Sequence, residues 1–247
     1  MDKAFILTAR TDSSRLSSKI IKKIHKKLRV IDIIIKRAKK INLPIILATT
    51  QKKSDDFLCS YVKRKYKIII FRGNNLSKIK RWHQCFKKYN IKYACIVEGD
   101  DPLFDYNIYK KEIQKKIKHE ILTCPKDIIT GNFFYIISRK GLAKLKKFTE
   151  RRGYNNVEII DPLVKMAKLK KKTIAVKKIF RKKNIRLTLD YHEDYILIKK
   201  IINKFGYLVK NDKVVNFLIK NKDLSSINYF REKYWVKKQL SIIKKFR

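Results

Sequence analysis

Residues 3–19 have the sequence KAFILTARTDSSRLSSK, in which a short apolar run opens into a polar loop. The run Lys3–Ala9 is typical of a buried strand. Similar runs follow at Pro44–Thr49, Lys67–Phe71 and Lys92–Val97. The segments between them have helical spacing. Alternating strands and helices predict βαβ units, which form a parallel sheet with helices on both faces.

The helices between these strands have recognisable boundaries. They are expected at Leu28–Ile41, from Ser54 as the N-cap to about Tyr66, and at Leu76–Tyr89. In the second half we expect strands at Asn132–Ile137, Thr173–Ile179 and Ile185–Leu189, and helices at about 138–148, 192–204, 212–219 and 226–243.

No Pro/Gly-rich linker and no internal repeat divides the chain. We therefore expect a main unit of residues 1–205, with residues 206–247 as a helical C-terminal extension of the same domain.

The chain is strongly basic, with 64 Lys+Arg against 21 Asp+Glu and a formal net charge of +43. At 45% hydrophobic residues it can still bury a core. The lysines are spread along the whole chain beside many Ile and Asn residues, which favours A/T-rich codon usage over a dedicated binding stripe. A basic protein that binds nucleic acid or an anionic surface remains an alternative, supported by Phe230, Tyr234 and Trp235 in the basic tail. For these aromatics, helix packing is the competing interpretation.

Cysteine and histidine spacing indicates neither zinc nor disulfides. The cysteines form no CxxC pair and the histidines lack zinc-ligand spacing. The N-terminus does not resemble a signal peptide, and no uncharged run approaches the length of a membrane helix. We expect a cytoplasmic protein with free thiols, no membrane insertion and no specific nucleic-acid partner.

The loop after the first strand gathers cations and hydroxyl groups. Arg10, Arg15 and Lys19 lie within ten residues, with Ser13 and Ser14 between them. Guanidinium groups bind phosphate oxygens bidentately and lysine adds a point charge, so this loop could bind a triphosphate. Because basic residues are abundant here, a solvated basic loop is the alternative.

The loop after the fourth strand is unusual for this composition because acids crowd into eight residues: Glu98, Asp100, Asp101 and Asp105. Such a cluster at a strand end indicates a neutralising cation, and Mg²⁺ prefers carboxylate oxygens. A helix N-terminus explains Asp105 as well. Asp190, which follows the predicted strand Ile185–Leu189, is a second metal candidate. Glu193 and Asp194 fit the first turn of the next helix.

These stretches resemble a known family. Arg10-x-x-Ser-Ser-Arg-Leu-x-x-Lys19 is similar to the N-terminal signature of cytidylyltransferases that activate acidic sugars, such as the CMP-Kdo and CMP-acylneuraminate synthetases. The layout is closest to the spore-coat polysaccharide biosynthesis protein F type. Further matching stretches lie in the same order, between about residues 4 and 228: Ala48–Thr50, Phe71–Gly73, Gly99–Leu103, Ile185–Asp194 and Ser226–Asn228.

The resemblance implies a three-layer α/β sandwich of the nucleotide-diphospho-sugar transferase type with a mainly parallel sheet, and makes residues 1–205 a nucleotidyltransferase domain. It also implies transfer of CMP from CTP to an acidic sugar (Kdo, sialic acid or related), with release of pyrophosphate, for surface polysaccharide synthesis. CTP and a sugar acid would be its partners and Mg²⁺ its cofactor, and a homodimer is an open option.

The resemblance also assigns roles. Arg10, Arg15 and Lys19, with Ser13 and Ser14, would bind the CTP phosphates, and Arg72 and Asp101 would contribute to the nucleotide site. Asp100 and Asp190 would hold Mg²⁺. Arg10, Lys19 and Asp100 would be catalytic.

The chain departs from the family pattern in four places. Ser17-Ser18 replaces a usual Pro-Gly, Glu98 replaces a neutral residue, Asn74–Lys78 lacks the usual acids after Gly73, and the middle segment of about 106–184 matches poorly. A catalytically inactive family member is therefore a further alternative.

Overall fold

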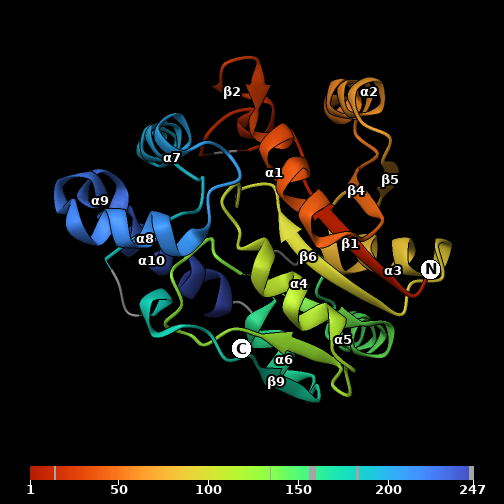
Figure 1. The fold of residues 1–247 in the computed structure, drawn as a ribbon. Coiled ribbons are helices and arrows are strands. Elements are labelled where there is room, and N and C mark those ends of the chain that lie inside the picture. Colours follow the sequence, from red (N-terminus) through yellow and green to blue (C-terminus); the bar gives the residue numbers. More distant parts are fainter. Residues whose placement is uncertain (14, 134, 156–159, 182–183, 245–247) are drawn as a thin grey trace.

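A mixed, mostly parallel seven-stranded sheet forms the centre of the molecule (Figure 1). The computed structural model describes residues 1–13, 15–133, 135–155, 160–181 and 184–244. The sheet has the order β5-β4-β1-β6-β8-β7-β9. Its strands are β1 (Lys3–Thr8), β4 (Ile45–Thr50), β5 (Ile69–Gly73), β6 (Tyr93–Glu98), β7 (Ile121–Thr123), β8 (Tyr135–Ser138) and β9 (Lys171–Thr173). Strand β8 runs antiparallel to both neighbours, and the other pairings are parallel. A small ribbon pairs β2 (Lys23–His25) with β3 (Leu28–Arg29).

Helices cover both faces of the sheet, which confirms the predicted three layers. Side chains of β1 alternate between two cores: Phe5 and Leu7 enter one, and Ala4 and Ile6 the other. The first core is covered by α1 (Val30–Ala38), α2 (Asp56–Lys65), α4 (Tyr106–Gln114), α7 (His192–Phe205) and α8 (Asn211–Lys220). The second is covered by α3 (Lys78–Lys88), α5 (Arg139–Arg151) and α6 (Asp161–Met166).

Local capping explains where several helices begin. Ser77 caps α3 by accepting a hydrogen bond from the Lys80 amide, and Ser138 caps α5 in the same way. The predicted Ser54 cap is wrong, because Lys53–Asp55 forms a 3₁₀ turn and α2 begins at Asp56.

Two predicted strands in the second half are also wrong. Ile185–Leu189 forms only one isolated bridge, between Arg186 and Thr130. The segment is held instead by two backbone bonds, from Leu187 N to the Thr130 carbonyl (2.9 Å) and from Leu189 N to the Asp100 carbonyl (2.6 Å). The predicted strand Thr173–Ile179 covers only the end of β9, and a 3₁₀ turn follows at Lys178–Phe180.

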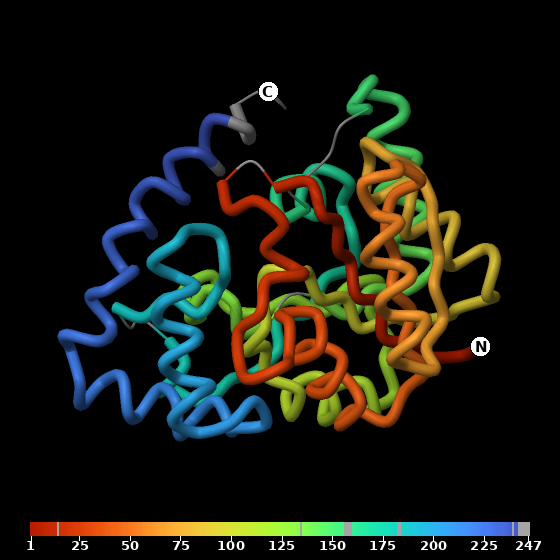
Figure 2. The backbone as a smooth tube through the Cα atoms, turned by 90° about the horizontal axis from the view of Figure 1, so that it is seen from above, coloured from red at the N-terminus to blue at the C-terminus, as the bar shows by residue number. Residues whose placement is uncertain are grey.

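The C-terminal helices lie along the edge of the molecule opposite the N-terminus (Figure 2). The predicted helix of about 226–243 is divided into α9 (Lys222–Tyr229) and α10 (Arg231–Lys244). Phe230 and Tyr234 are 47% and 60% exposed, whereas Trp235 is half-buried and its ring centre lies 5.7 Å from the Arg186 guanidinium. Packing therefore explains Trp235 better than the other two aromatics. Among the described helices, none combines the length and the apolar character needed to cross a membrane.

Candidate active site

The loops that follow the parallel neighbours β1 and β6 meet at one edge of the sheet. The ammonium of Lys19 lies 3.2 Å from Oδ2 of Asp100 and 2.9 Å from Oδ1 of Asp190. It also donates to the Leu189 carbonyl at 2.9 Å. Lys19 and Asp100 therefore lie together as the order of the parallel strands predicts. Asp190 joins them from a segment that forms no strand.

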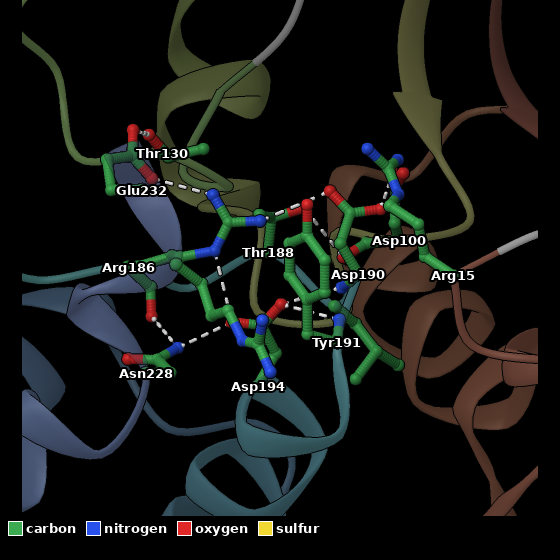
Figure 3. A network of polar contacts seen from close by, with 12 residues as sticks. Arg15, Asp100, Thr130, Arg186, Thr188, Asp190, Tyr191, Asp194, Asn228 and Glu232 are labelled. Atoms are coloured by element: carbon green, nitrogen blue, oxygen red, sulfur yellow. Dashed lines mark hydrogen bonds and ion pairs between the residues drawn. The ribbon is translucent and has the colours of Figure 1, made fainter. Parts of the chain in front are cut away.

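Asp190 is the centre of this cluster and is 1% exposed. Arg15 contacts its Oδ1 at 2.6 Å, and Arg186 contacts its Oδ2 at 3.2 Å (Figure 3). Burial alone would raise the pKa of Asp190, but Lys19, Arg15 and Arg186 hold it below its ordinary value. Asp190 is therefore an ionised carboxylate with cations on both sides.

Lys19 is charged because two neighbouring carboxylates outweigh the effect of its burial. Burial would lower its pKa, but the charges of Asp100 and Asp190 raise it above its ordinary value.

An open hollow of about 550 Å³ is lined by other residues of the loop after β1 and by Ser54. Arg10 and Ser13 line it, together with Ser17, Ser18 and Ser54. Ser18 has φ 51°, the left-handed conformation that favours the usual glycine. The predicted residue Ser14 lies outside the described residues.

Arg72 lies at the end of β5, where its donors hold the turn after β4. It donates to the Thr50 carbonyl (2.9 Å) and the Lys52 carbonyl (2.7 Å), and pairs with Asp56 (2.5 Å). Arg72 therefore anchors the turn after β4, and none of these three contacts is with Lys19 or Asp100.

The remaining acids of the second loop point in different directions. Asp101 is buried against the Thr188 side chain, and burial together with the charge of Asp100 raises its pKa well above the ordinary value. Asp105 caps α4 by accepting from the Asn107 amide at 2.9 Å, as the helix-terminus interpretation predicts. Glu98, which stands where the family usually has a neutral residue, forms an ion pair with Lys78.

The oxygen atoms at the cluster suit a divalent cation. Carboxylate oxygens of Asp100 and Asp190 and the Leu189 carbonyl already surround one positive charge, the Lys19 ammonium. Mg²⁺ prefers such oxygen ligands and commonly shares them with substrate phosphates. Within the described part of the chain, no group of three or more His, Cys, Asp or Glu could hold a metal. The two aspartates would therefore need ligands from a substrate.

The residues that hold Asp190 from the protein interior were not predicted from the sequence. Arg186 has no exposed side chain and contacts Asp190, Asp194 (3.0 Å) and Glu232 (2.6 Å). Asn228 donates to Asp194 at 2.8 Å. Two signals were present, an arginine inside the apolar run Ile185–Leu189 and the family-like stretches Ile185–Asp194 and Ser226–Asn228. Neither signal indicates that these residues contact one another or that Glu232 joins them.

Comparisons with known proteins identify the family and the fold. A family model described as Cytidylyltransferase matches residues 4–201. The spore coat polysaccharide biosynthesis protein SpsF of Bacillus subtilis is 24% identical over 243 residues, covering 91% of this chain and 97% of that protein.

Two solved structures share the fold. A cytidylyltransferase from Leptospira borgpetersenii has a TM-score of 0.79 at 24% identity, covering 91% of this chain and 96% of that chain. A CMP:2-keto-3-deoxy-manno-octonic acid synthetase complexed with CTP has a TM-score of 0.60 at 12% identity, covering 82% of this chain and 98% of that chain. The fold is the α/β sandwich of the nucleotide-diphospho-sugar transferase type, as predicted.

The family match begins inside β1 and ends within α7. It includes the cationic loop, the acidic loop and Asp190 in one continuous span. The chain belongs to the cytidylyltransferase family.

Proposed function

We propose that this chain transfers CMP from CTP to the hydroxyl of an acidic sugar such as Kdo, sialic acid or a related compound. The observation that carries the proposal is the position of Lys19, whose ammonium lies between the carboxylates of Asp100 and Asp190. Membership of the cytidylyltransferase family supports the nucleotide. A relative named for spore coat polysaccharide biosynthesis, and the fold shared with a synthetase that was solved with CTP, support the acceptor class.

In this proposal the residues divide the work by charge. Arg10, Arg15 and Lys19 would bind the phosphates, with Ser13 and Ser14 supplying hydroxyl groups. Asp100 and Asp190 would hold Mg²⁺, which when bound neutralises charge on the phosphate oxygens.

Arg72 would act on the nucleotide through the turn that it anchors. Asp101 would support the nucleotide site from its buried position beside Thr188. These two assignments, like the division at residue 205, remain predictions.

The reaction itself needs little covalent chemistry from the protein. The acceptor hydroxyl attacks the α-phosphorus in line and gives up its proton to water as a new P–O bond forms. The bond from the α-phosphorus to the bridging oxygen breaks, and pyrophosphate leaves with that electron pair. Positioning and charge neutralisation supply most of the catalysis in such transfers. Arg10, Lys19 and Asp100 would be the catalytic residues. We propose that the reaction takes place in the cytoplasm, where it would supply surface polysaccharide synthesis, and leave monomer or homodimer open.

The direct test is pyrophosphate release from CTP and Mg²⁺ with a panel of 2-keto sugar acids. We expect release with at least one acceptor. Asp100→Asn should abolish turnover while weakening CTP binding much less, because the cation acts mainly on charge that develops in the transition state. No release with any acceptor together with no CTP binding would contradict the proposal. CTP binding without any release would instead favour an inactive family member.

A further inference from the structure

We propose that Glu232 of α10 is a positioning residue that fixes Asp190 through Arg186, so that the C-terminal extension completes the active site. The inference rests on the proposed role of Asp190 as a metal ligand. It adds a residue from outside the span that matches the family, which ends at residue 201.

Arg186 is the link because it is fully buried and has carboxylates on three sides. Nη2 contacts Asp190 at 3.2 Å, Nε contacts Asp194 at 3.0 Å and Nη1 contacts Glu232 at 2.6 Å (Figure 3). A guanidinium is a rigid planar fork, so fixing one donor limits where the others can point. The orientation of Nη2 toward Asp190 therefore depends on what holds Nη1.

Glu232 is itself held in place, which makes it a suitable anchor. Its second carboxylate oxygen, Oε1, accepts a hydrogen bond from the Thr130 hydroxyl at 2.8 Å. The Thr130 carbonyl in turn accepts from the Leu187 amide at 2.9 Å. Glu232 thus holds the Arg186 side chain directly, and through Thr130 it also holds the backbone at Leu187.

Asn228 of α9 contributes a second tie from the same extension. Its amide donates to the Arg186 carbonyl at 3.1 Å and to Asp194 at 2.8 Å. Asp194 accepts from the backbone amides of Asp190 (2.8 Å) and Tyr191 (2.9 Å). The main chain and the side chain of Asp190 are therefore both held by groups that reach back to the extension.

The balance of charge gives Glu232 a further effect on Asp190. Without Glu232, the buried Arg186 would lose one of its three carboxylate partners and could turn toward either of the other two, Asp190 and Asp194. Asp190 would then lose the fixed orientation that a metal ligand needs. Loss of a group that touches a metal ligand typically costs 10- to 100-fold in affinity, and Glu232 acts one contact further away through Arg186, so the lower end of this range is expected.

The chain offers a matched control in the other ion pair that anchors α10. Glu193 of α7 pairs with Arg231 at 2.6 Å, and both side chains are as partly exposed as Glu232. This pair docks α10 onto α7 without touching Arg186. Glu193→Ala therefore removes a tether of the same helix and leaves the proposed link intact.

The experiment compares Glu232→Ala, Glu232→Gln and Glu193→Ala with the unaltered chain in two measurements. The first is Mn²⁺ affinity in the presence of CTP, followed by electron paramagnetic resonance. We expect Glu232→Ala to lose about tenfold or more, Glu232→Gln to lose less because it keeps an accepting oxygen, and Glu193→Ala to remain close to the unaltered chain. Unchanged Mn²⁺ affinity in Glu232→Ala, or an equal loss in Glu193→Ala, would overturn the proposal.

The second measurement is amide hydrogen exchange across residues 186–189, which does not depend on any ligand and leaves out Tyr191, whose ring contacts Arg231 of the control pair. Faster exchange there in Glu232→Ala but not in Glu193→Ala is expected if Glu232 fixes this segment. Equal exchange in both variants would overturn the positioning role. If the unaltered chain binds neither CTP nor Mn²⁺, the proposed function fails, while the exchange data still decide whether Glu232 holds the segment.

Discussion

Single residues in the cationic loop carry measurable backbone strain. Ser18 has φ 51°, which costs an L-residue about 1–2 kcal/mol, whereas glycine has no such cost but loses about 0.5–1 kcal/mol of chain entropy on folding. We therefore expect Ser18→Gly to stabilise the fold by up to about 1 kcal/mol in urea unfolding. Ser17→Gly, at a neighbouring position without positive φ, should destabilise by about 0.5–1 kcal/mol. Equal losses in both variants would show that the strain at Ser18 is absent.

At this scale the sequence predicted part of the cluster. Lys19 and Asp100 were expected in loops that follow two parallel strands, and these loops meet. Asp190 lies beside them although the strand predicted before it does not form. Arg186 and Glu232 could not be predicted, because their contact depends on how a C-terminal helix docks. No short-range pattern encodes that contact.

Among the structural elements, the turn after β4 is tied to the cationic loop by Asp55. Its buried carboxylate accepts from the Thr11 amide at 2.7 Å and the Thr50 amide at 3.1 Å. Burial alone would raise the pKa of Asp55, but hydrogen bonds from Thr50, Thr11 and Thr49 hold it below its ordinary value. Asp55→Asn would turn an amide NH₂ toward these donors and should cost about 1.5–3 kcal/mol near pH 7.

The pH dependence of that loss follows from the lowered pKa. The unfolded chain protonates Asp55 at about pH 3.9, so the stabilisation is fully present above this pH and disappears as the pH falls through the lower folded pKa. Urea unfolding between pH 7 and pH 3 gives the free energy of unfolding of Asp55→Asn and of the unaltered chain. The difference between the two should become smaller below about pH 4. The exposed neighbour is the control, since Asp56→Asn should cost less than about 1 kcal/mol. A gap that stays constant with pH would contradict the assignment.

Central elements were predictable and peripheral ones were not. Strands β1, β4 and β6 are apolar runs buried on both faces, and such runs are recognisable without tertiary information. Ile185–Leu189 is similarly apolar apart from Arg186, yet its backbone amides bond to the Thr130 and Asp100 carbonyls and not to a neighbouring strand. Its partners come from loops, so its apolar pattern predicted a strand that does not form.

For the whole molecule, the charge of +43 predicts attraction to any polyanion. If this attraction is only nonspecific, the affinity for an oligonucleotide, measured by fluorescence anisotropy, should fall about 10³-fold or more between 50 and 200 mM salt. Such a fall would correspond to about six or more phosphate contacts. CTP binding should change much less over this range. Oligonucleotide binding that persists at high salt and displaces CTP would instead favour the alternative function, a basic protein that binds nucleic acid or an anionic surface.

Arg37 connects the extension to the main unit, so it tests whether residues 1–247 unfold together. Its buried guanidinium on α1 donates to the carbonyls of Phe104 (2.8 Å), Tyr207 (2.9 Å) and Val209 (3.0 Å). Arg37→Met would leave these acceptors buried without partners, at about 1–3 kcal/mol each, so we expect at least about 3 kcal/mol of lost stability. The control is Arg64→Met at an exposed position, whose free energy of unfolding should stay within about 0.5 kcal/mol of the unaltered chain.

One calorimetric transition in both variants is expected if the extension belongs to the same domain. A second, independent transition assigned to residues 206–247 would contradict it, since a separately folding extension would lose its own contacts without lowering the stability of the sheet.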